Sequence, residues 1–182
     1  MIRIFDFLFS FFGLLFLWPI LVILYLIGLF DTGSPIFVQE RVGKYKKPFK
    51  LIKFRTMPVN TKSVATHLSK DIAITPFGSF LRKSKLDELP QLINVLMGDM
   101  SLVGPRPNLY NQTELIEERG RRGVYNAVPG ITGLSQINEI DMSTPRELAV
   151  KDSEMIQNLN VSNYFRYIFA TVGGKGQGDR IK

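Results

Sequence analysis

The longest hydrophobic stretch of the chain covers residues 7–30 and contains no charged side chain. About 20 consecutive apolar residues are enough for a helix to cross a bilayer, so this stretch predicts a membrane helix. A signal peptide would have a shorter apolar part, followed by a small-residue cleavage site. Pro19 lies near the middle, where it removes a helical hydrogen bond and bends the helix. The pattern alone leaves open a kinked helix that spans the membrane and a re-entrant hairpin that returns to its entry face.

The chain after residue 31 alternates strand patterns with helical ones. This alternation predicts a mostly helical domain of the α/β (α+β) class with a short sheet. Short apolar runs bounded by turn residues predict strands at residues 36–38, 49–54 and 128–137. Helical signals predict helices at residues 75–82, 87–97, 110–122 and 146–158. The expected parts are a membrane anchor at 1–31, a folded domain at 32–172 and a flexible, basic, Gly-rich tail at 173–182.

The predicted helix around Pro90 carries the most informative polar residues. Leucine and isoleucine recur there at three- and four-residue steps, which describes one apolar face of a helix. Proline is tolerated in the first helical turn, so a start with Asp87 near the N-cap accommodates Pro90, and Gly98 then ends the helix. Asp87 and Glu88 would lie beside free backbone N–H groups at the positive end of the helix dipole. That place suits capping carboxylates, and it also suits a bound phosphate or divalent cation.

The amino-acid composition excludes several kinds of functional site. The 182 residues contain no cysteine, and His67 is the single histidine, so disulfides, thiolate or His-rich metal sites and Ser-His-Asp triads are excluded. The net charge is +7, and much of the excess lies in a basic run at residues 41–55, next to Glu40. Basic runs bind nucleic acid, anionic lipid or phosphorylated small molecules. Because this run follows directly on the apolar stretch, we expect it to face an anionic membrane leaflet.

The remaining polar residues suit phosphoryl transfer. No glycine-rich phosphate-binding turn of the Rossmann or Walker type occurs in the sequence. The sequence offers instead the Asp87–Glu88 pair, several lysines and arginines, and Arg106 held between two prolines. A divalent metal and an arginine can neutralise phosphate oxygens, while a carboxylate can attack phosphorus.

A series of motifs extends this interpretation: RIFDF at 3–7, QERVG at 39–43, KFRTM at 53–57, LDELPQ at 86–91, NVL at 94–96, GDMSLVGPRP at 98–107 and PGITG at 129–133. In this order the motifs resemble the monotopic phosphoglycosyl transferases, bacterial sugar transferases that load a sugar phosphate onto polyprenyl phosphate. The resemblance extends from Arg3 to about Val172. The size is similar to the minimal, single-domain form of that family.

The resemblance implies a reaction and a set of site residues. Asp87 matches the family's nucleophile and Glu88 its partner, and this pair is expected to bind Mg²⁺. Asp87 would attack the β-phosphate of a UDP-sugar, releasing UMP, and polyprenyl (undecaprenyl) phosphate would then attack the phosphosugar–Asp87 intermediate. The positions that match phosphate- or substrate-binding residues are Lys53, Arg55, Arg82, Arg106 and Asp152.

The resemblance also implies a re-entrant first helix, which the family breaks at a Ser-Pro pair. Trp18-Pro19 stands at this place here, and tryptophan lacks the hydroxyl that can accept a hydrogen bond at a break. The expected location is the bacterial inner (cytoplasmic) membrane, with the catalytic domain on the cytoplasmic face. The expected partners are UDP-sugar, polyprenyl phosphate and membrane lipids, without nucleic acid, and the sequence is compatible with a homo-oligomer.

Two other functions remain open at this stage. The same carboxylates could serve a nucleotide-sugar hydrolase that uses water as acceptor. The apolar helix and the basic run alone would suffice for a non-catalytic module that binds anionic lipid. Neither the sugar nor the glycan pathway can be read from the sequence.

Overall fold

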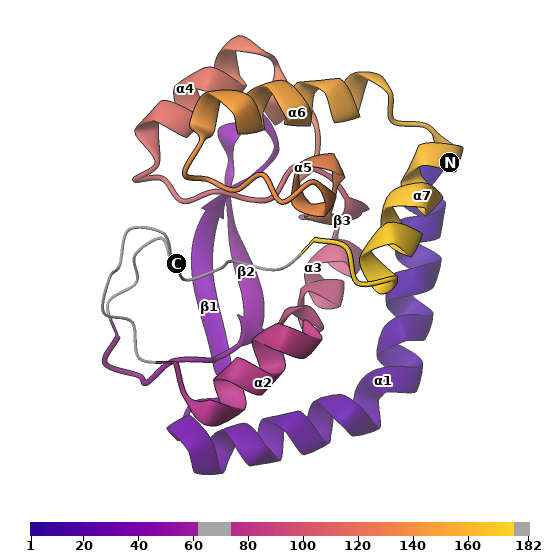
Figure 1. The fold of residues 1–182 in the computed structure, drawn as a ribbon. Coiled ribbons are helices and arrows are strands. Elements are labelled where there is room, and N and C mark those ends of the chain that lie inside the picture. The colour runs from indigo at the N-terminus through magenta and orange to yellow at the C-terminus, as the bar shows by residue number, and fades with distance from the viewer. Residues whose placement is uncertain (62–73, 177–182) are drawn as a thin grey trace.

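The computed structural model describes residues 1–61 and 74–176, which form a body of short helices and strands bordered by one long helix (Figure 1). This mixed architecture agrees with the helix-and-strand class predicted from the sequence. His67 lies outside the described residues, as does the part of the expected tail at residues 177–182.

The long helix α1 (Ile2–Thr32) is continuous through Pro19 and bends along its length (Figure 1). Within the described residues it is the one helix that is long and apolar enough to cross a membrane, judged by length and composition. Its large apolar side chains face mostly outward, and Trp18 is 60% exposed. The expected break at Trp18-Pro19 is therefore a bend within one helix. Proline removes a single hydrogen bond, and the neighbouring turns keep theirs.

Polar contacts attach the start of α1 to the body. The guanidinium of Arg3 donates to the backbone carbonyls of Val95 and Leu96, at distances of 2.5 and 3.0 Å. The buried carboxylate of Asp6 accepts hydrogen bonds from the backbone N–H of Leu102 and the hydroxyl of Tyr164, each at 2.9 Å. A buried carboxylate needs such partners, so this end of α1 is fixed to the body.

The other end of α1 is attached to the same body. The hydroxyl of Thr75 donates to the carboxylate of Asp31 at 2.7 Å. Leu24 is buried against Phe54 and Leu81, which belong to the body. Both ends of the apolar helix therefore contact one folded unit.

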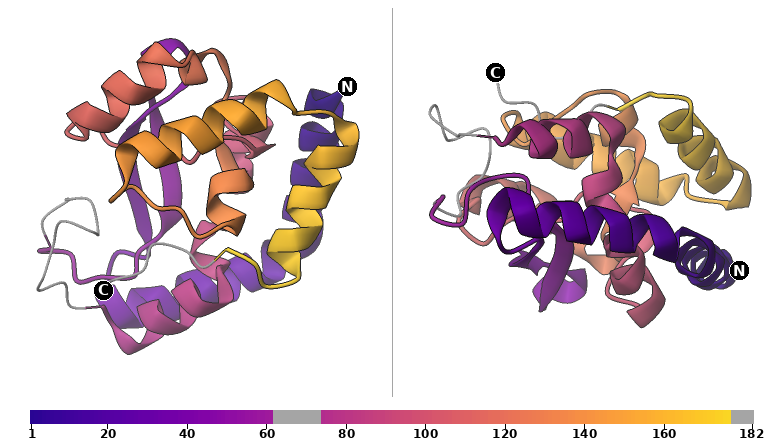
Figure 2. Two further views of the ribbon diagram at one scale, coloured as in Figure 1. Left: turned by 45° about the horizontal axis from the view of Figure 1, so that its top comes forward. Right: turned by 90° about the horizontal axis from the view of Figure 1, so that it is seen from below.

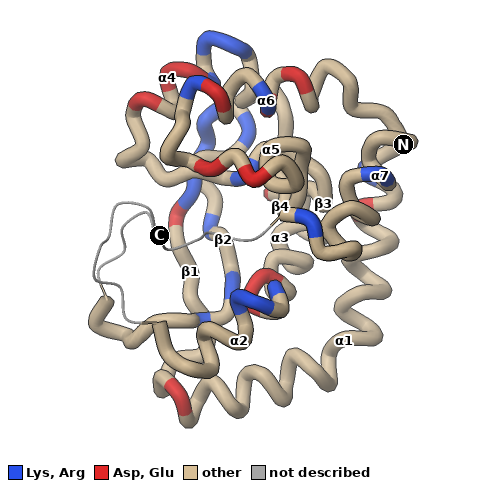
Figure 3. The backbone as a smooth tube through the Cα atoms, in the orientation of Figure 1, with Lys and Arg blue, Asp and Glu red and all other residues tan. Residues whose placement is uncertain are grey.

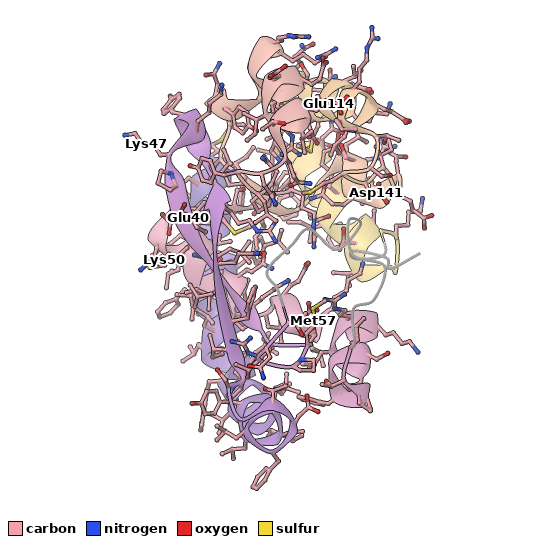
Figure 4. All side chains as sticks on the ribbon, turned by 90° about the vertical axis from the view of Figure 1, so that its left-hand side faces the viewer. Glu40, Lys47, Lys50, Met57, Glu114 and Asp141 are labelled. Carbon is pink, nitrogen blue, oxygen red and sulfur yellow. The ribbon has the colours of Figure 1, made fainter. Side chains whose placement is uncertain are left out.

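The predicted hairpin is confirmed as β1 (Ile36–Val42) paired antiparallel with β2 (Pro48–Phe54). The basic turn between them, η1 (Lys44–Lys46), lies on the side of the molecule away from the bend of α1 (Figure 1). Figure 4 shows Lys47 and Lys50 at the outer edge of the hairpin, pointing away from the body.

The hairpin therefore carries the basic turn away from α1, and the expected contact of the basic run with an anionic leaflet stays a prediction. A strand rises about 3.3 Å per residue, so β1 carries the basic turn roughly 20 Å from the end of α1. The hydroxyl of Tyr110 donates to the backbone carbonyl of Lys46 at 2.9 Å, which ties this turn to the far part of the body.

Helix α2 (Pro76–Ser84) begins where the sequence predicts. The hydroxyl of its N-cap residue Thr75 accepts a hydrogen bond from the backbone N–H of Gly78 at 2.9 Å. Pro76 occupies the first helical position, where its missing N–H costs nothing. The helix ends at Lys85, which adopts a left-handed φ of 58°.

The expected single helix from Asp87 onward is instead a 3₁₀ turn, η3 (Leu86–Glu88), followed by α3 (Gln91–Met97). Pro90 is the N-cap of α3, so the two carboxylates precede this helix by one turn. The predicted arrangement at the N-terminus of the helix dipole is therefore wrong. The left-handed turn at Lys85 starts the 3₁₀ segment before the proline is reached.

The buried face of α3 is also more polar than its leucine pattern predicts. Gln91, Asn94 and Val95 are buried, whereas Ile93 is exposed. The side chain of Asn94 accepts from the backbone N–H of Ile52 and donates to the carbonyl of Lys50, which joins α3 to β2. These two bonds pair a backbone N–H and a backbone carbonyl of β2 that the hairpin leaves without a partner. They explain why the polar side of α3 faces inward.

A second pair of strands, β3 (Ser101–Val103) and β4 (Gly130–Thr132), runs parallel beside α3. Their glycines allow a very close backbone approach. A Cβ atom on Gly130 would lie 2.0 Å from the backbone nitrogen of Gly104, so no side chain can be accommodated. The pairing fixes the position of the loop that begins at Gly104 and carries Arg106.

The remaining elements are α4 (Thr113–Arg121), η4 (Val124–Asn126), α5 (Leu134–Ile137), α6 (Pro145–Gln157) and α7 (Val161–Val172). The strand predicted to continue to residue 137 ends at Thr132, because α5 begins after the extended Gly133. Figure 2 shows α7 beside the first part of α1, and Phe165 of α7 packs edge-on against Phe5 at 5.2 Å.

Candidate active site

The junction between α2 and α3 holds the two adjacent carboxylates. Lys85 is a non-glycine residue with positive φ, a conformation that is uncommon and mildly strained. It reverses the chain so that Asp87 points into the body and is only 8% exposed. Figure 3 shows acidic and basic segments together at this junction, whereas most of α1 carries no charge.

Cations from three separate elements surround this pair. Arg106, from the loop after β3, donates to Oε1 of Glu88 at 2.7 Å in a half-buried ion pair. Lys53 of β2 and Arg82 of α2 are close enough, together with Arg106, to lower the pKa of Asp87. Three of the five predicted phosphate-binding residues therefore gather around the predicted nucleophile.

Arg55 lies beside the cluster in a bracing position. Its guanidinium donates to the backbone carbonyl of Ser34 at 2.8 Å and lies over the ring of Phe37. Lys53 lies over the same ring, with its ammonium 5.6 Å from the centroid. Arg55 therefore holds the start of the hairpin, which in turn positions Lys53.

Burial has the largest effect on the ionisation of Asp87. Burial and the charge of Glu88 together raise the pKa of this carboxyl group from 3.8 to about 6, against the opposing effect of the three cations. A raised pKa means that the folded protein binds this proton more tightly than the unfolded chain does. Ionisation of Asp87 therefore lowers the free energy of unfolding. This loss begins as the pH rises above 3.8 and is complete above about pH 6.

We expect Asp87→Asn to stabilise the protein in metal-free buffer at pH 7.5. The amide resembles the neutral acid, so it avoids a penalty of about 2–3 kcal/mol, at 1.36 kcal/mol per pKa unit. Thermal unfolding in detergent with EDTA should give a higher Tm for the variant at pH 7.5 and equal values near pH 4. A gain that is the same at both pH values would contradict the raised pKa.

The structure does not bring Asp152 to this cluster. It is fully buried and forms an ion pair of 2.6 Å with Arg119, whose side chain is 2% exposed. The hydroxyl of Ser135 donates to the other carboxylate oxygen at 2.7 Å. The structure therefore shows Asp152 holding Arg119, and its expected role in binding substrate stays a prediction.

Arg119 is the functional candidate that the sequence did not indicate. The sequence predicts only a helix at residues 110–122 here, yet Arg119 lies in the buried face of α4. Its guanidinium donates to the backbone carbonyl of Arg106 at 2.9 Å and to the side chain of Asn108 at 3.0 Å. Arg119 thus fixes the backbone of the residue whose side chain holds Glu88.

The carboxylate pair fits Mg²⁺ better than a metal held by protein ligands alone. Among the described residues there is no group of three or more His, Cys, Asp or Glu side chains that could hold a metal ion. Mg²⁺ binds typically through one or two carboxylates, completed by water and substrate phosphates. Asp87 and Glu88 match this donor set.

The comparisons with known proteins show the family of this chain. The family model for bacterial sugar transferases matches residues 1–175. The chain belongs to the bacterial sugar transferase family. This result confirms the family resemblance found in the sequence.

Curated members of the family are similar over most of this chain. The UDP-galactose-lipid carrier transferase of Erwinia amylovora is 39% identical over 173 residues, which are 85% of this chain and 36% of that protein. The UDP-glucose:undecaprenyl-phosphate glucose-1-phosphate transferase of Escherichia coli is 41% identical over 155 residues, 80% of this chain and 33% of that protein. The undecaprenyl-phosphate galactose phosphotransferase of Salmonella typhimurium is 35% identical over 189 residues, 93% of this chain and 39% of that protein. The chain thus spans little more than a third of these relatives.

Proposed function

We propose that this bacterial sugar transferase moves a sugar 1-phosphate from a UDP-sugar to polyprenyl phosphate and releases UMP. The observation that carries the proposal is the buried carboxyl group of Asp87, with three cations around it and Glu88 bonded to Arg106. The names of the relatives support a lipid-linked acceptor, and they differ in the sugar. The sugar used by this chain is therefore left open.

The proposed reaction has two half-reactions at one phosphorus atom. In the first, a carboxylate oxygen of Asp87 bonds to the β-phosphorus of the UDP-sugar, and the bond from that phosphorus to the bridging oxygen breaks. UMP leaves with the bridging oxygen and its electron pair, and the sugar phosphate remains on Asp87. In the second, an oxygen of polyprenyl phosphate attacks the same phosphorus, and Asp87 leaves as a free carboxylate.

Each charged residue has a defined part in this proposal. A pKa of about 6 leaves most of Asp87 ionised at neutral pH, so the nucleophile is available. Lys53, Arg82 and Arg106 would bind the diphosphate oxygens and offset the charge that develops on them. When bound at Asp87 and Glu88, Mg²⁺ would supply further neutralisation of phosphate charge.

The second part of the proposal is that α1 is a re-entrant membrane helix. A straight helix of its 31 residues would be about 46 Å long, at about 1.5 Å per residue, and would leave its ends on opposite membrane faces. The bend, and the bonds of Arg3 and Asp31 to one body, support a hairpin whose ends lie on the same face. We assign that face to the cytoplasm because the chain after the helix is basic.

Topology can be tested with single cysteines, because the chain has none of its own. We expect Ile4→Cys and Val150→Cys to be protected equally from an impermeant thiol reagent outside intact cells, and to be labelled after lysis. Adding Pro19→Leu should straighten the helix and increase outside labelling of Ile4→Cys. Outside labelling of Ile4→Cys without the proline change would support a spanning helix.

We expect Arg106→Lys to lower kcat by roughly 100-fold while the protein stays folded and membrane-bound. Lysine keeps the charge but cannot bind phosphate or carboxylate oxygens bidentately, and loss of one preorganised donor to a transition state typically costs 100- to 1,000-fold. Arg121→Lys, an exposed change on α4, is the matched control. Near-normal turnover of Arg106→Lys would show that Arg106 only braces its loop.

One assay separates the proposed transferase from the two alternatives. The protein is incubated with Mg²⁺ and a panel of UDP-sugars, with and without polyprenyl phosphate, and UMP is measured. A transferase releases UMP catalytically only with the lipid, a hydrolase does so without it, and a non-catalytic lipid-binding module releases none. Continuous UMP release without lipid would contradict the proposal.

A further inference from the structure

A pocket of about 200 Å³ is lined in part by Glu88. Lys53, Arg82 and Arg106 do not line it. The walls of the pocket come from α3 and the residues just before it, from β3 and β4, and from α7. The lining side chains are mainly apolar and include Leu89, Leu92, Leu102, Ile131, Ile168 and Val172.

The polar groups of the pocket are few. The side-chain amide of Gln136 is buried there without a hydrogen-bond partner among the described residues. The hydroxyls of Thr132 and Thr171 form a hydrogen bond to each other at 2.5 Å. Lys85 donates from its ammonium to the backbone carbonyl of Lys175 at 3.0 Å, and this residue and Glu88 line the same pocket. The pocket therefore combines an apolar interior with a charged edge.

The size and the lining of the pocket limit what it can bind. A dry apolar cavity of about 150 Å³ accommodates benzene, so this pocket suits one five-carbon unit or slightly more. Pockets for drug-sized ligands are larger, at roughly 300–1,000 Å³. A sugar would bury several hydroxyl groups against mainly aliphatic walls, and the amide of Gln136 could pair with only a part of them, which is costly. A short branched hydrocarbon segment fits this volume and has no hydroxyl groups that need hydrogen-bond partners.

The surroundings connect the pocket to the apolar helix. Leu92 lines the pocket and also packs on α1, since a Cβ atom on Gly13 would lie 3.2 Å from its side chain. On α7, Val172 at the edge of the pocket is 81% exposed and Phe169 is 70% exposed. An apolar chain bound in the pocket could thus continue along exposed apolar side chains of α7 and α1, two helices that lie side by side (Figure 2).

We propose that this pocket binds the isoprene unit nearest the phosphate of the polyprenyl phosphate acceptor. The acceptor phosphate then lies at the edge formed by Lys85 and Glu88, next to Asp87. Lys85 and Arg106 offset the negative charge of Glu88 there. This inference rests on the proposed transferase function and adds to it a separate place for the acceptor, distinct from the cations proposed to bind the donor.

The test uses farnesyl phosphate in detergent micelles as a short acceptor. Val172→Trp puts a large ring at the exposed edge of the pocket, and the control Val150→Trp changes an exposed valine of α6 that does not line it. We expect the KM for farnesyl phosphate to rise about tenfold or more in Val172→Trp, because the displaced unit loses the burial of about five carbon groups. The KM for the UDP-sugar should change less than twofold, and Val150→Trp should resemble the unmodified protein. Equal acceptor KM values in both variants would overturn the assignment.

A measurement on the unmodified protein covers the case in which Val172→Trp does not fold. Farnesyl phosphate with a photoreactive diazirine on its first isoprene unit is irradiated with the full chain, and the labelled peptides are mapped. Labels on Leu89, Leu92 or Ile168 support the pocket, whereas labels confined to α1 overturn it. Failure of UMP release with every acceptor would instead refute the transferase function, so the two failures are distinguishable.

Discussion

Asp87→Asn is expected to abolish UMP release, with a loss of at least 1,000-fold, while the protein remains folded. Asparagine keeps the shape of the side chain but lacks the charged oxygen that attacks phosphorus in covalent catalysis. UMP is measured in a coupled assay with saturating UDP-sugar, Mg²⁺ and polyprenyl phosphate.

The stability of Asp87→Asn shows whether its loss of activity is due to unfolding. Because burial raises the pKa of Asp87, the asparagine form should be at least as stable as the unmodified chain at neutral pH. Glu117→Gln, which removes one negative charge from the exposed face of α4, is the control and should keep its activity. Substantial turnover by a pure preparation of Asp87→Asn would contradict the assignment of the nucleophile.

Asp152→Asn is expected to lower the free energy of unfolding by about 3–5 kcal/mol. The change leaves the buried guanidinium of Arg119 without its counter-charge, and breaking a buried ion pair on one side typically costs this much. A corresponding fall in Tm of roughly 6–20 °C should be seen for a chain of this size. Thermal unfolding in detergent measures it.

A double variant separates the two roles of this ion pair. Arg119→Met with Asp152→Leu leaves no unpaired charge and should recover part of the lost stability. It cannot restore the hydrogen bond from Arg119 to the backbone carbonyl of Arg106, so the recovered protein should still show a reduced kcat. Full activity in the double variant would mean that the pair does not position the Arg106 loop.

Features with a local cause could be predicted from the sequence. Thr75 and Pro76 mark the start of α2 because a hydroxyl cap and a first-turn proline act within a few residues. The hairpin of β1 and β2 follows from two apolar runs around a turn. The charge types at the site were also predictable, and the structure gathers Lys53, Arg82 and Arg106 around Asp87.

Features that depend on distant residues could not be predicted in the same way. Arg119 and Asp152 are 33 positions apart on two charged helices, and only the packing of α4 against α6 shows that they pair. The start of α3 at Pro90 depends on the left-handed turn at Lys85, which no glycine marks in the sequence. Which side of α3 faces inward depends on the hydrogen bond between the side chain of Asn94 and the backbone N–H of Ile52 on β2.

The most direct test of the proposed mechanism is to trap the covalent intermediate. The full chain is incubated with a panel of UDP-sugars and Mg²⁺ in the absence of any lipid acceptor, and is then analysed by intact mass and peptide mapping. The mechanism predicts a mass increase of one sugar phosphate on the peptide that contains Asp87, and loss of this mass when polyprenyl phosphate is added. An adduct on another residue, or lipid-dependent turnover by a chain that never carries an adduct, would contradict it.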